Sequence, residues 1–568
     1  MALAASSAGA VTFAYTGAVQ NYTIVSAGIY KLQAYGAQGG NATSYGNVAG
    51  GYGAAVGRFA TIGANTSLSV VVGESGGGSN SNGGGGGGGT FIMSGSSPVL
   101  VAGGGGGAGN ARDAVTGVPS PASLRTFGQN GGAYGYGGFN GYGGSAGGQG
   151  RGQGYGGSGG GAGIHSNGGT ATGSYAGVGN GGGGGSAPAF QGGGGAYFNS
   201  IAGSGGFGGG GGGSAGPGAG GGGGGGGFSG GGGTSFNQGG GGGGSFGNDS
   251  TFIAVANHSG NGSASIDAIR LFAAPTLSTH TLDFGVVRGG FTAQQQGVTI
   301  TNTVIADPAS DKLVTVLGSL PATVTSQAAS ASIAAGQSNT IVFSLSATPG
   351  STSADVGLAF TSHATTGDDI DLGSSTVHIT GIVTDLAVAV IVGKGDGLLT
   401  FKNGHYVLDL GDVAANSGVR STLVSMLNGV RYSAYSERLN GYYSGLSSDG
   451  FSLALRNPIN IADDGQPPVL FGQTEYVEGG KQTDLGLLGF DPTGLSLGRH
   501  SRTIDFYALT TFGNFPAYGG PDAPITVEAN VTAGVPVAGV PEPATWGLLT
   551  AGFGMIGAAM RRRKLRLA

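Results

Sequence analysis

The residues best suited to metal chemistry are two short groups of aspartates. Asp368, Asp369 and Asp371 lie within four positions of one another, and Asp463 is followed directly by Asp464. Carboxylate oxygens at loop spacing are the ligands that Ca²⁺ prefers. Neither group shows the twelve-residue ligand pattern of a dedicated calcium loop, so solvated turns are the alternative and the favoured interpretation.

The other reactive side chains form no recognisable catalytic or zinc-binding pattern. The seven histidines are dispersed, with no pair at the i, i+4 spacing of a helical zinc site, and the chain has no cysteine. No G-x-S-x-G turn precedes a helix, and no G-x-x-x-x-G-K-[ST] phosphate loop occurs. Matches to G-x-G-x-x-G follow from the glycine content alone. We therefore predict no catalytic residue, no metal site and no cofactor.

The charge content argues against a polyanionic partner. Charged residues make up 9% of the chain, with 22 basic and 27 acidic residues and a net charge of −5. Nucleic-acid binding depends on Lys and Arg side chains that neutralise phosphates. Residues 36–250 contain only Arg58, Arg112, Arg125 and Arg151 as basic residues. We therefore predict that the protein does not bind nucleic acid.

The most informative residues lie near the C-terminus. Pro541, Glu542 and Pro543 precede an uncharged segment of 17 residues, 544–560, which as a helix is about 25 Å long, at the short end of a membrane span. A basic cluster follows directly and favours a cytoplasmic C-terminus. Its members are Arg561, Arg562, Arg563, Lys564 and Arg566. The sequence predicts a transmembrane helix whose four glycines indicate processing rather than permanent packing.

This order of Pro-Glu-Pro, apolar segment and basic cluster resembles the PEP-CTERM sorting signal. The resemblance implies export by the general secretory route in a Gram-negative bacterium, with transient anchoring in the inner membrane. It also implies cleavage near Pro541-Glu542-Pro543 by an exosortase, a membrane transpeptidase. An ordinary C-terminal anchor is the alternative. Residues 1–10 are interpreted as the remnant of a signal peptide whose true start lies upstream, unless the start is artificial or that of a pseudogene.

The chain between the two termini includes a glycine-rich block. Glycine supplies 135 of the 568 residues, against an ordinary share of about 7%, and 92 of the 135 lie in residues 31–250. Bare glycine runs lose much entropy on ordering and bury no side chain, which favours disorder. Single aromatic residues between the runs favour order, because they could pin the backbone. They are Tyr134, Tyr136, Phe139, Tyr142, Tyr155, Tyr175, Phe190, Tyr197, Phe207, Phe228, Phe236 and Phe246.

Segments rich in Val, Ile, Tyr and Thr flank and enter this block and predict strands at residues 11–15, 21–25, 29–35, 68–72, 98–102 and 263–272. Residues 13–40 and 260–272 resemble the opening and closing strands of bacterial glycine-rich domains similar to the glycine-rich region of the anaplastic lymphoma kinase receptors. For residues 11–273 the resemblance implies a jelly-roll-like sandwich with a poly-Gly insertion of laterally bonded threefold helices. The receptors' ligand role does not carry over, because the matching residues are framework.

The remaining chain has the composition of β-sandwiches. HTLDFGVVRGG, from His280, recurs loosely as YVLDLGDVAAN, from Tyr406, 126 residues later. This repeat predicts two related modules, residues 274–383 and 384–533. The first, with LDFGVVRGG and GVTITNT, resembles the choice-of-anchor D type of immunoglobulin-like domain of bacterial surface proteins, and the second is more divergent.

The sequence as a whole predicts an all-β chain. We expect the glycine-rich jelly-roll-like sandwich, two immunoglobulin-like β-sandwiches and, in residues 534–568, the sorting signal with its transmembrane helix. The expected function is that of a non-catalytic exported protein of the cell surface or extracellular matrix. The alternative is an adhesin or carbohydrate-binding protein acting on exopolysaccharide, with self-association as a further option. An enzyme acting on polysaccharide would need paired carboxylates, which a sequence cannot place in space.

Overall fold

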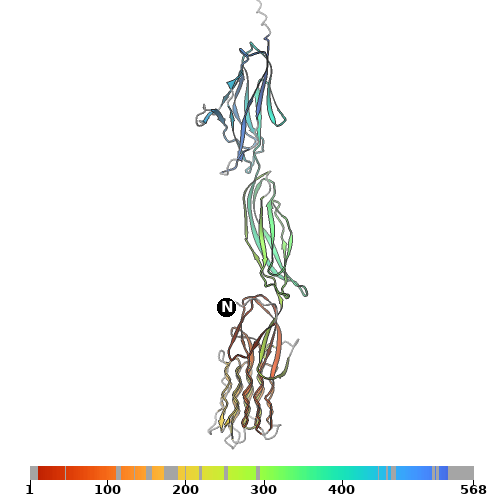
Figure 1. The fold of residues 1–568 in the computed structure, drawn as a ribbon, viewed down its shortest axis with the longest axis vertical. Helices are drawn as coiled ribbons and strands as arrows, with labels where there is room; N and C mark the ends of the chain where they lie inside the picture. Colours follow the sequence, from red (N-terminus) through yellow and green to blue (C-terminus); the bar gives the residue numbers. More distant parts are fainter. Residues whose placement is uncertain are drawn as a thin grey trace, which may run out of the picture.

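The chain forms three β modules that follow one another along the long axis (Figure 1). Module 1 contains strands β1 to β11, module 2 strands β12 to β20, and module 3 strands β21 to β34. Every regular element in the described residues is a strand, which confirms the all-β fold class. The computed structural model describes residues 10–534 except 45, 111–116, 133–134, 149–155, 172–189, 199, 217–219, 248–253, 290–293, 445–446, 456–457, 462–468, 514–517 and 520–523.

Module 1 is built on two antiparallel sheets with a shared apolar core. The sheets have the orders β1-β11-β3-β4-β10 and β2-β5-β6-β7. Every second side chain of β3 is buried, and Leu32 and Val56 from one sheet share the core with Ile92 and Leu100 from the other. The strands are β1 (Val11–Ala14), β2 (Gln20–Thr23), β3 (Gly28–Tyr35), β4 (Gly53–Ile62), β5 (Ser67–Val71), β6 (Thr90–Ser94), β7 (Ser97–Ala102), β8 (Tyr197–Phe198), β9 (Ser200–Ile201), β10 (Ala254–His258) and β11 (Ser263–Leu271).

The six strands predicted for this module are confirmed as β1, β2, β3, β5, β7 and β11. The prediction missed β4, β6, β10 and the two-residue strands β8 and β9. Strand β4 begins with small residues, Gly53, Ala54 and Ala55, which have low strand preference but fit a crowded position beside the glycine segments. Packing against neighbours therefore outweighed the local preference.

The glycine-rich residues do not form one insertion. They enter at three connections of the sandwich, between β3 and β4, between β5 and β6, and between β7 and β10. Figure 1 shows the resulting extended segments side by side below the sheets, at the end of the molecule away from module 2. The prediction of a single insertion is therefore wrong, because three separate connections build one packed layer.

The glycine segments are ordered by hydrogen bonds that repeat every three residues. In the run Gly103–Gly107 and the two residues after it, N–H groups three residues apart point to the same neighbouring segment. Gly104 and Gly107 donate to residues 223–226, Gly105 and Ala108 to residues 37–40, and Gly106 and Gly109 to residues 117–120. A sheet strand has two hydrogen-bonded neighbours, whereas this run has three, as expected of an extended threefold helix.

The close approach of these segments requires glycine. A Cβ atom added at Gly225 would lie 2.2 Å from the carbonyl oxygen of Gly104, and one added at Gly86 would lie 2.0 Å from that of Gly224. Because each glycine brings a backbone donor and acceptor to its neighbours, lateral hydrogen bonds replace side-chain burial as the ordering interaction. In the described residues the block is therefore ordered; the run at residues 181–185 lies outside them.

Only some of the aromatic residues pin this block. Phe190 and Phe207 are buried against Phe91 of the sandwich, and the rings of Phe228 and Phe246 stack at 4.7 Å. By contrast, a second group is exposed, contrary to the pinning prediction: Tyr136, Phe139, Tyr142, Tyr197 and Phe236. Tyr134, Tyr155 and Tyr175 lie outside the described residues.

Module 2 consists of two sheets around its own core. Their orders are β12-β14-β18-β16 and β13-β20-β19-β15-β17, and Val298, Phe343 and Ile379 are fully enclosed between them. The strands are β12 (Pro275–Leu277), β13 (Thr281–Arg288), β14 (Gln295–Asn302), β15 (Lys312–Leu317), β16 (Val324–Ser326), β17 (Ser330–Ile333), β18 (Ser338–Leu345), β19 (Gly350–His363) and β20 (Ile370–Thr384).

Module 3 has three sheets around a third core, with the orders β21-β24-β30-β27-β26, β22-β23-β34-β31 and β28-β29-β25-β32-β33. The strands are β21 (Ala389–Gly395), β22 (Leu398–Lys402), β23 (His405–Ala414), β24 (Arg420–Asn428), β25 (Arg438–Ser444), β26 (Ser447–Ser448), β27 (Phe451–Leu455), β28 (Pro458–Ile461), β29 (Val469–Gln473), β30 (Gln482–Phe490), β31 (Gly498–Ile504), β32 (Phe506–Thr511), β33 (Tyr518–Gly519) and β34 (Ile525–Thr532).

The predicted repeat between modules 2 and 3 is confirmed in local structure. Gly285 and Gly411 have φ angles of 60° and 68°, in the left-handed region that favours glycine. Their N–H groups donate to the carboxylates of Asp283 and Asp409 at 3.0 and 2.9 Å. Strands β13 and β23 pair in parallel with β20 and β34, and both registers shift at this glycine. The repeated Leu-Asp-x-Gly is thus a bulge that bends the strand.

Candidate functional site

The predicted sorting residues lie outside the described residues. This applies to Pro541, Glu542 and Pro543 and to the basic cluster Arg561, Arg562, Arg563, Lys564 and Arg566, as well as to the predicted transmembrane helix at residues 544–560. In the part of the chain that is described, no helix has the length and hydropathy needed to cross a membrane.

The aspartates considered as calcium ligands lie in the β19–β20 loop and at the start of β20, and each has another partner. The Asp369 carboxylate lies 2.9 Å from Nδ1 of His363, and the Asp371 carboxylate accepts the Gly373 N–H. The main-chain carbonyl of Asp368 accepts a hydrogen bond from Arg270. The described residues hold no group of three or more His, Asp or Glu side chains able to bind a metal ion. Asp463 and Asp464 lie outside those residues.

A surface groove in module 1 has a volume of about 400 Å³. Residues 47–52 and residues 118–121 supply most of its lining. The lining residues are Asn47, Val48, Ala49, Gly50, Gly51, Tyr52, Val118, Pro119, Pro121 and Ala256. Among the described lining residues there is no carboxylate, imidazole or amine that could act as a general acid or base near neutral pH.

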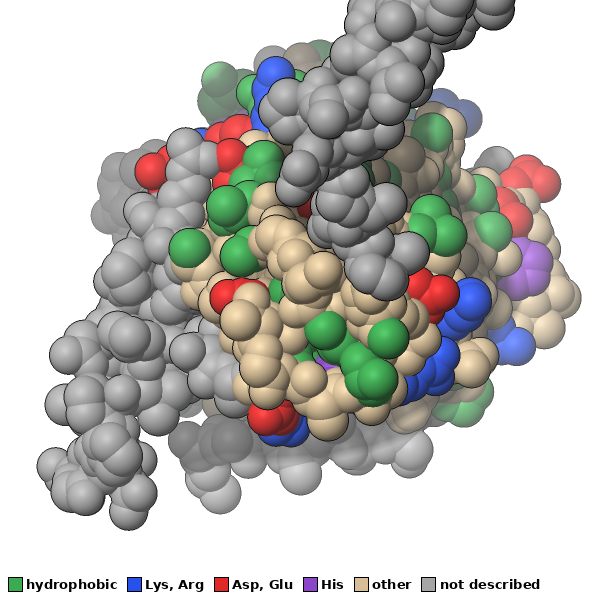
Figure 2. All heavy atoms as spheres, turned by 90° about the horizontal axis from the view of Figure 1, so that it is seen from above, with side chains coloured by type: hydrophobic (Ala, Val, Ile, Leu, Met, Phe, Trp, Pro, Cys, Tyr) green, Lys and Arg blue, Asp and Glu red, His purple; other side chains and the backbone are tan. Residues whose placement is uncertain are grey.

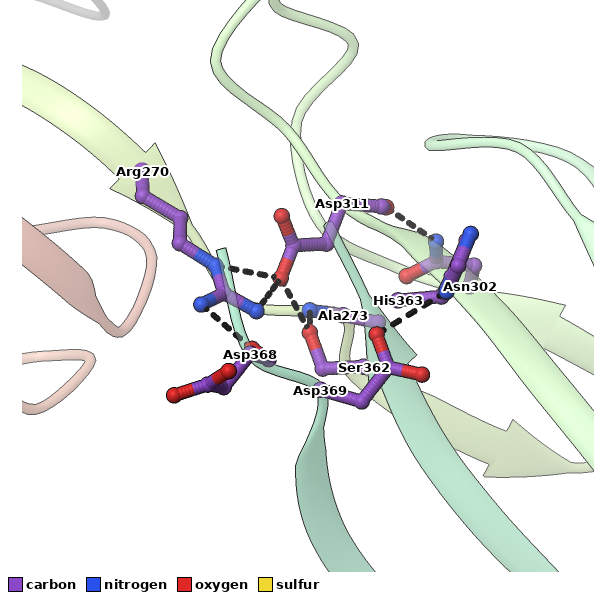
Figure 3. Close-up of polar contacts among 8 residues, drawn as sticks. All are labelled: Arg270, Ala273, Asn302, Asp311, Ser362, His363, Asp368 and Asp369. Atoms are coloured by element: carbon purple, nitrogen blue, oxygen red, sulfur yellow. Dashed lines mark hydrogen bonds and ion pairs between the residues drawn. The ribbon is translucent and has the colours of Figure 1, made fainter. Parts of the chain in front are cut away.

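The most developed polar cluster joins modules 1 and 2 (Figure 3). Arg270 lies at the end of β11, and its Nε and Nη2 atoms both lie 2.9 Å from Oδ2 of Asp311, the residue before β15. The Asp311 side chain is only 4% exposed. Ser362, on β19, donates its hydroxyl to the same carboxylate oxygen at 2.7 Å. A buried carboxylate thus receives a guanidinium and a hydroxyl, which compensate for its lost hydration.

Backbone atoms complete this junction. The Leu271 N–H donates to the Ala309 carbonyl at 2.8 Å, and the Asp311 N–H donates to the Leu271 carbonyl at 2.9 Å. Asp307 holds the receiving loop, because its carboxylate accepts the Ala309 N–H. The side-chain amide of Asn302 bonds to the Asp311 carbonyl, as Figure 3 also shows. The contacts of this cluster are hydrogen bonds and an ion pair between protein groups of modules 1 and 2. The cluster therefore connects the two modules.

Sequence reasoning missed this junction, although a signal was present. Asn302, Val304 and the stretch Ser310-Asp311-Lys312-Leu313 recur 126 residues later as Asn428, Val430 and Ser436-Glu437-Arg438-Leu439. This is the same spacing as that of the Leu-Asp-x-Gly repeat. Extending the repeat comparison beyond that motif would have drawn attention to the acidic residue.

Comparison with known proteins gives one informative match. Residues 539–564 match the family model described as the PEP-CTERM protein-sorting motif. No curated protein matches the chain. Similar solved structures include a protein of unknown function from Porphyromonas gingivalis W83, with 15% identity, a TM-score of 0.17 and coverage of 45% of this chain and 99% of that one. The class 5 fimbriae chaperone CfaA has 10% identity, a TM-score of 0.15 and coverage of 44% and 99%.

A third similar structure, the E. coli chaperone DraB, has 9% identity, a TM-score of 0.14 and coverage of 44% of this chain and 98% of that one. These TM-scores are too low for any of the three structures to support an argument about this chain. The C-terminal match is of a different kind, because it covers the motif, the apolar segment and most of the basic cluster. The chain therefore carries a PEP-CTERM sorting motif, which implies an exported protein processed by a membrane exosortase.

Proposed function

We propose that this protein is a non-catalytic component of the cell surface or extracellular matrix that presents its glycine-rich module away from the site of sorting. The observation that carries the proposal is the sorting motif at residues 539–564, which directly follows module 3. Figure 1 places the glycine-rich layer at the opposite end of the molecule from module 3. A protein sorted at its C-terminus would thus hold this layer at the greatest distance from the membrane.

The chemistry of the described surfaces supports a non-catalytic role. The described lining residues of the groove in module 1 include no carboxylate, imidazole or amine. In Figure 2, which looks along the long axis at module 3, acidic and basic side chains lie next to each other on the described part of the face. Within module 3, Arg499 and Glu528 form one ion pair, with a distance of 3.9 Å between Nη1 and Oε2. Such a surface does not form the basic field that a polyanion would need.

In the proposed sequence of events, residues 544–560 anchor the exported chain transiently in the inner membrane, with the five C-terminal cations on the cytoplasmic side. The exosortase then cleaves near Pro541-Glu542-Pro543. The released or transferred chain has lost the cations and reaches the surface or the extracellular matrix. The mature protein would therefore lack residues 561–568.

Intact-mass measurement of the protein isolated from its own cells tests this proposal. We expect a mass that lacks residues 561–568, and we expect Glu542→Ala to leave uncleaved chain in the membrane fraction. Pro536→Ala, outside the motif, is the matched control and should be processed normally. Recovery of the full-length chain as the sole surface species would contradict the proposal.

A second candidate function is binding of exopolysaccharide, and the exposed aromatic group of module 1 favours it. Burial along residues 135–147 has a period of three, with Gly135, Gly138, Gly141, Gly144 and Gly147 buried. Tyr136, Phe139 and Tyr142 each follow a buried glycine and are 59–68% exposed. Exposed rings on a neutral backbone suit stacking on sugar rings better than ion pairing.

A further inference from the structure

The junction between modules 2 and 3 contains a second ion pair of the same kind. Arg288, at the end of β13, places its Nε atom 3.1 Å from Oε1 of Glu437, the residue before β25. The Glu437 side chain is fully buried. The Thr384 hydroxyl, at the end of β20, donates to the same carboxylate oxygen at 2.8 Å. Both junctions thus enclose a carboxylate of the later module with a guanidinium of the earlier one.

The backbone contacts of the two junctions also correspond. Asp385 donates to the Tyr435 carbonyl and accepts from the Glu437 N–H, as Leu271 does with Ala309 and Asp311. Leu271 forms a parallel bridge with Ser310, and Asp385 forms one with Ser436. From these linker residues the first strand of the next module begins after the same number of residues, at Pro275 and at Ala389.

An asparagine holds the linker in each junction. Asn302 accepts the Ala274 N–H at 3.0 Å and donates to the carbonyl of Asp311. Asn428 accepts the Val388 N–H at 3.3 Å and donates to the carbonyl of Glu437 at 3.0 Å. The linker and the acidic loop are therefore tied together by the same side chain in both places.

We propose that these two junctions are copies of one rigid joint, which holds the three modules in line as a stiff rod. In each joint the acid and the arginine form the ion pair between modules, and the asparagine holds the linker by hydrogen bonds. In each case a very short linker is fixed by main-chain hydrogen bonds, and a buried charge pair spans the interface. A small bend that separated the two charges while the carboxylate stayed buried would leave that carboxylate without its partner, so intermediate bent states are disfavoured.

The hydroxyl group differs between the two copies. Ser362 belongs to the later of its two modules, whereas Thr384 belongs to the earlier of its two modules. Each hydroxyl donates a hydrogen bond to the buried carboxylate of its joint, but the two hydroxyls come from different strands. The joint therefore depends on the charge pair and the linker contacts, which are shared, more than on the origin of the hydroxyl.

Distance measurement between spin labels tests the second joint in the full chain. The chain has no cysteine, so Ser353→Cys on β19 and Ser501→Cys on β31, both exposed positions, provide unique label sites in modules 2 and 3. We expect a single narrow distance distribution. Arg288→Met should broaden it about twofold, because Glu437 then loses its guanidinium partner and the joint opens.

Two further variants separate the joint from general damage. Arg438→Met removes an exposed ion pair with Glu478 beside Glu437, within module 3, and should leave the distribution narrow. The double variant Arg288→Met and Glu437→Gln leaves no unpaired buried charge, so module 3 can keep its fold while the joint is weakened. Amide exchange of Val424 and Leu488 in the module 3 core reports whether that fold is intact.

A broad distribution in the otherwise unchanged chain would overturn the proposal. So would an unchanged narrow distribution in both Arg288 variants. The joint does not depend on the proposed surface role: failure of C-terminal processing would leave these distances unaffected, and a flexible chain could still be sorted.

Discussion

At the residue scale, the Asp283 carboxylate stabilises a bulge in β13, and its protonation is linked to the stability of the fold. It accepts hydrogen bonds from the Gly285 N–H and the Thr380 hydroxyl, both at 3.0 Å. These bonds favour the charged form and hold the pKa of the Asp283 carboxyl below its ordinary value of 3.8, with the backbone bond as the larger cause. The carboxylate therefore stabilises the fold above the unfolded-state pKa, and this contribution is lost as the pH falls through the lower, folded-state pKa.

We predict that Asp283→Asn lowers the melting temperature of module 2 at pH 7. The difference from the unchanged protein should shrink as the pH is lowered from about 4 towards 2, because both forms are then uncharged at this position. Thermal melts across this pH range provide the measurement. Asp368→Asn is the control, since the Asp368 carboxylate points away from the other residues in Figure 3. A constant difference at all pH values would contradict the assigned role.

Acidic residues of this chain also differ in burial in a way that the sequence does not reveal. Asp311 and Glu437 are enclosed, whereas Asp369, in the β19–β20 loop, and Asp371, at the start of β20, are exposed. Asp311 and Glu437 each lie between a serine and a basic residue, whereas Asp371 lies between an isoleucine and a leucine. Apolar neighbours therefore do not mark the enclosed acids. The difference arises because an arginine distant in sequence reaches the first two.

At the element scale, the glycine-rich segments depend on close backbone approach. Their N–H groups alternate among three neighbours, so each segment is bonded on several sides rather than in a flat sheet. Loss of conformational entropy opposes this order, and the lateral hydrogen bonds act in its favour. A side chain at a crowded position such as Gly225 would meet a neighbouring carbonyl oxygen and separate the segments.

We predict that Gly225→Ala destabilises module 1 by about 1–3 kcal/mol or more, because the new Cβ meets the Gly104 carbonyl oxygen and forces the segments apart. Gly194→Ala is the matched control, since a Cβ there meets nothing within 4 Å. Chemical denaturation of both variants measures the effect, and amide exchange of Gly104 and Gly226 reports the local loss of bonds. Equal stability of the two variants would argue against close packing of the layer.

At the scale of the whole molecule, low charge and exposed aromatic rings are the features on which the proposed polysaccharide binding rests. With 9% charged residues, few partners can be held mainly by ion pairs. The exposed group Tyr136, Phe139 and Tyr142 lies in the module furthest from module 3. A neutral polysaccharide, bound by stacking and hydrogen bonds, suits this arrangement.

If the second candidate function is correct, exopolysaccharide from the host should bind the full chain with an affinity that changes little between low and high salt. Replacing Tyr136, Phe139 and Tyr142 by Ala should weaken binding at least about tenfold, through loss of ring stacking. Tyr432→Ala is the control, because Tyr432 is 64% exposed but belongs to module 3. A steep loss of binding with added salt would show an electrostatic interaction instead.

The sequence by itself determined the all-β class, six strands of module 1, the repeat of modules 2 and 3, and the sorting motif. These features are local: alternation, a Leu-Asp-x-Gly bulge and a linear signal each reside in a few neighbouring residues. Only the tertiary structure decided that the glycine segments are ordered, that Phe190 and Phe207 are buried while Tyr136 and Phe139 are exposed, and that Arg270 and Arg288 reach buried acids in the next module. Those outcomes depend on which distant segments become neighbours, and a hydrogen bond or charge pair between segments leaves no periodic pattern in either one.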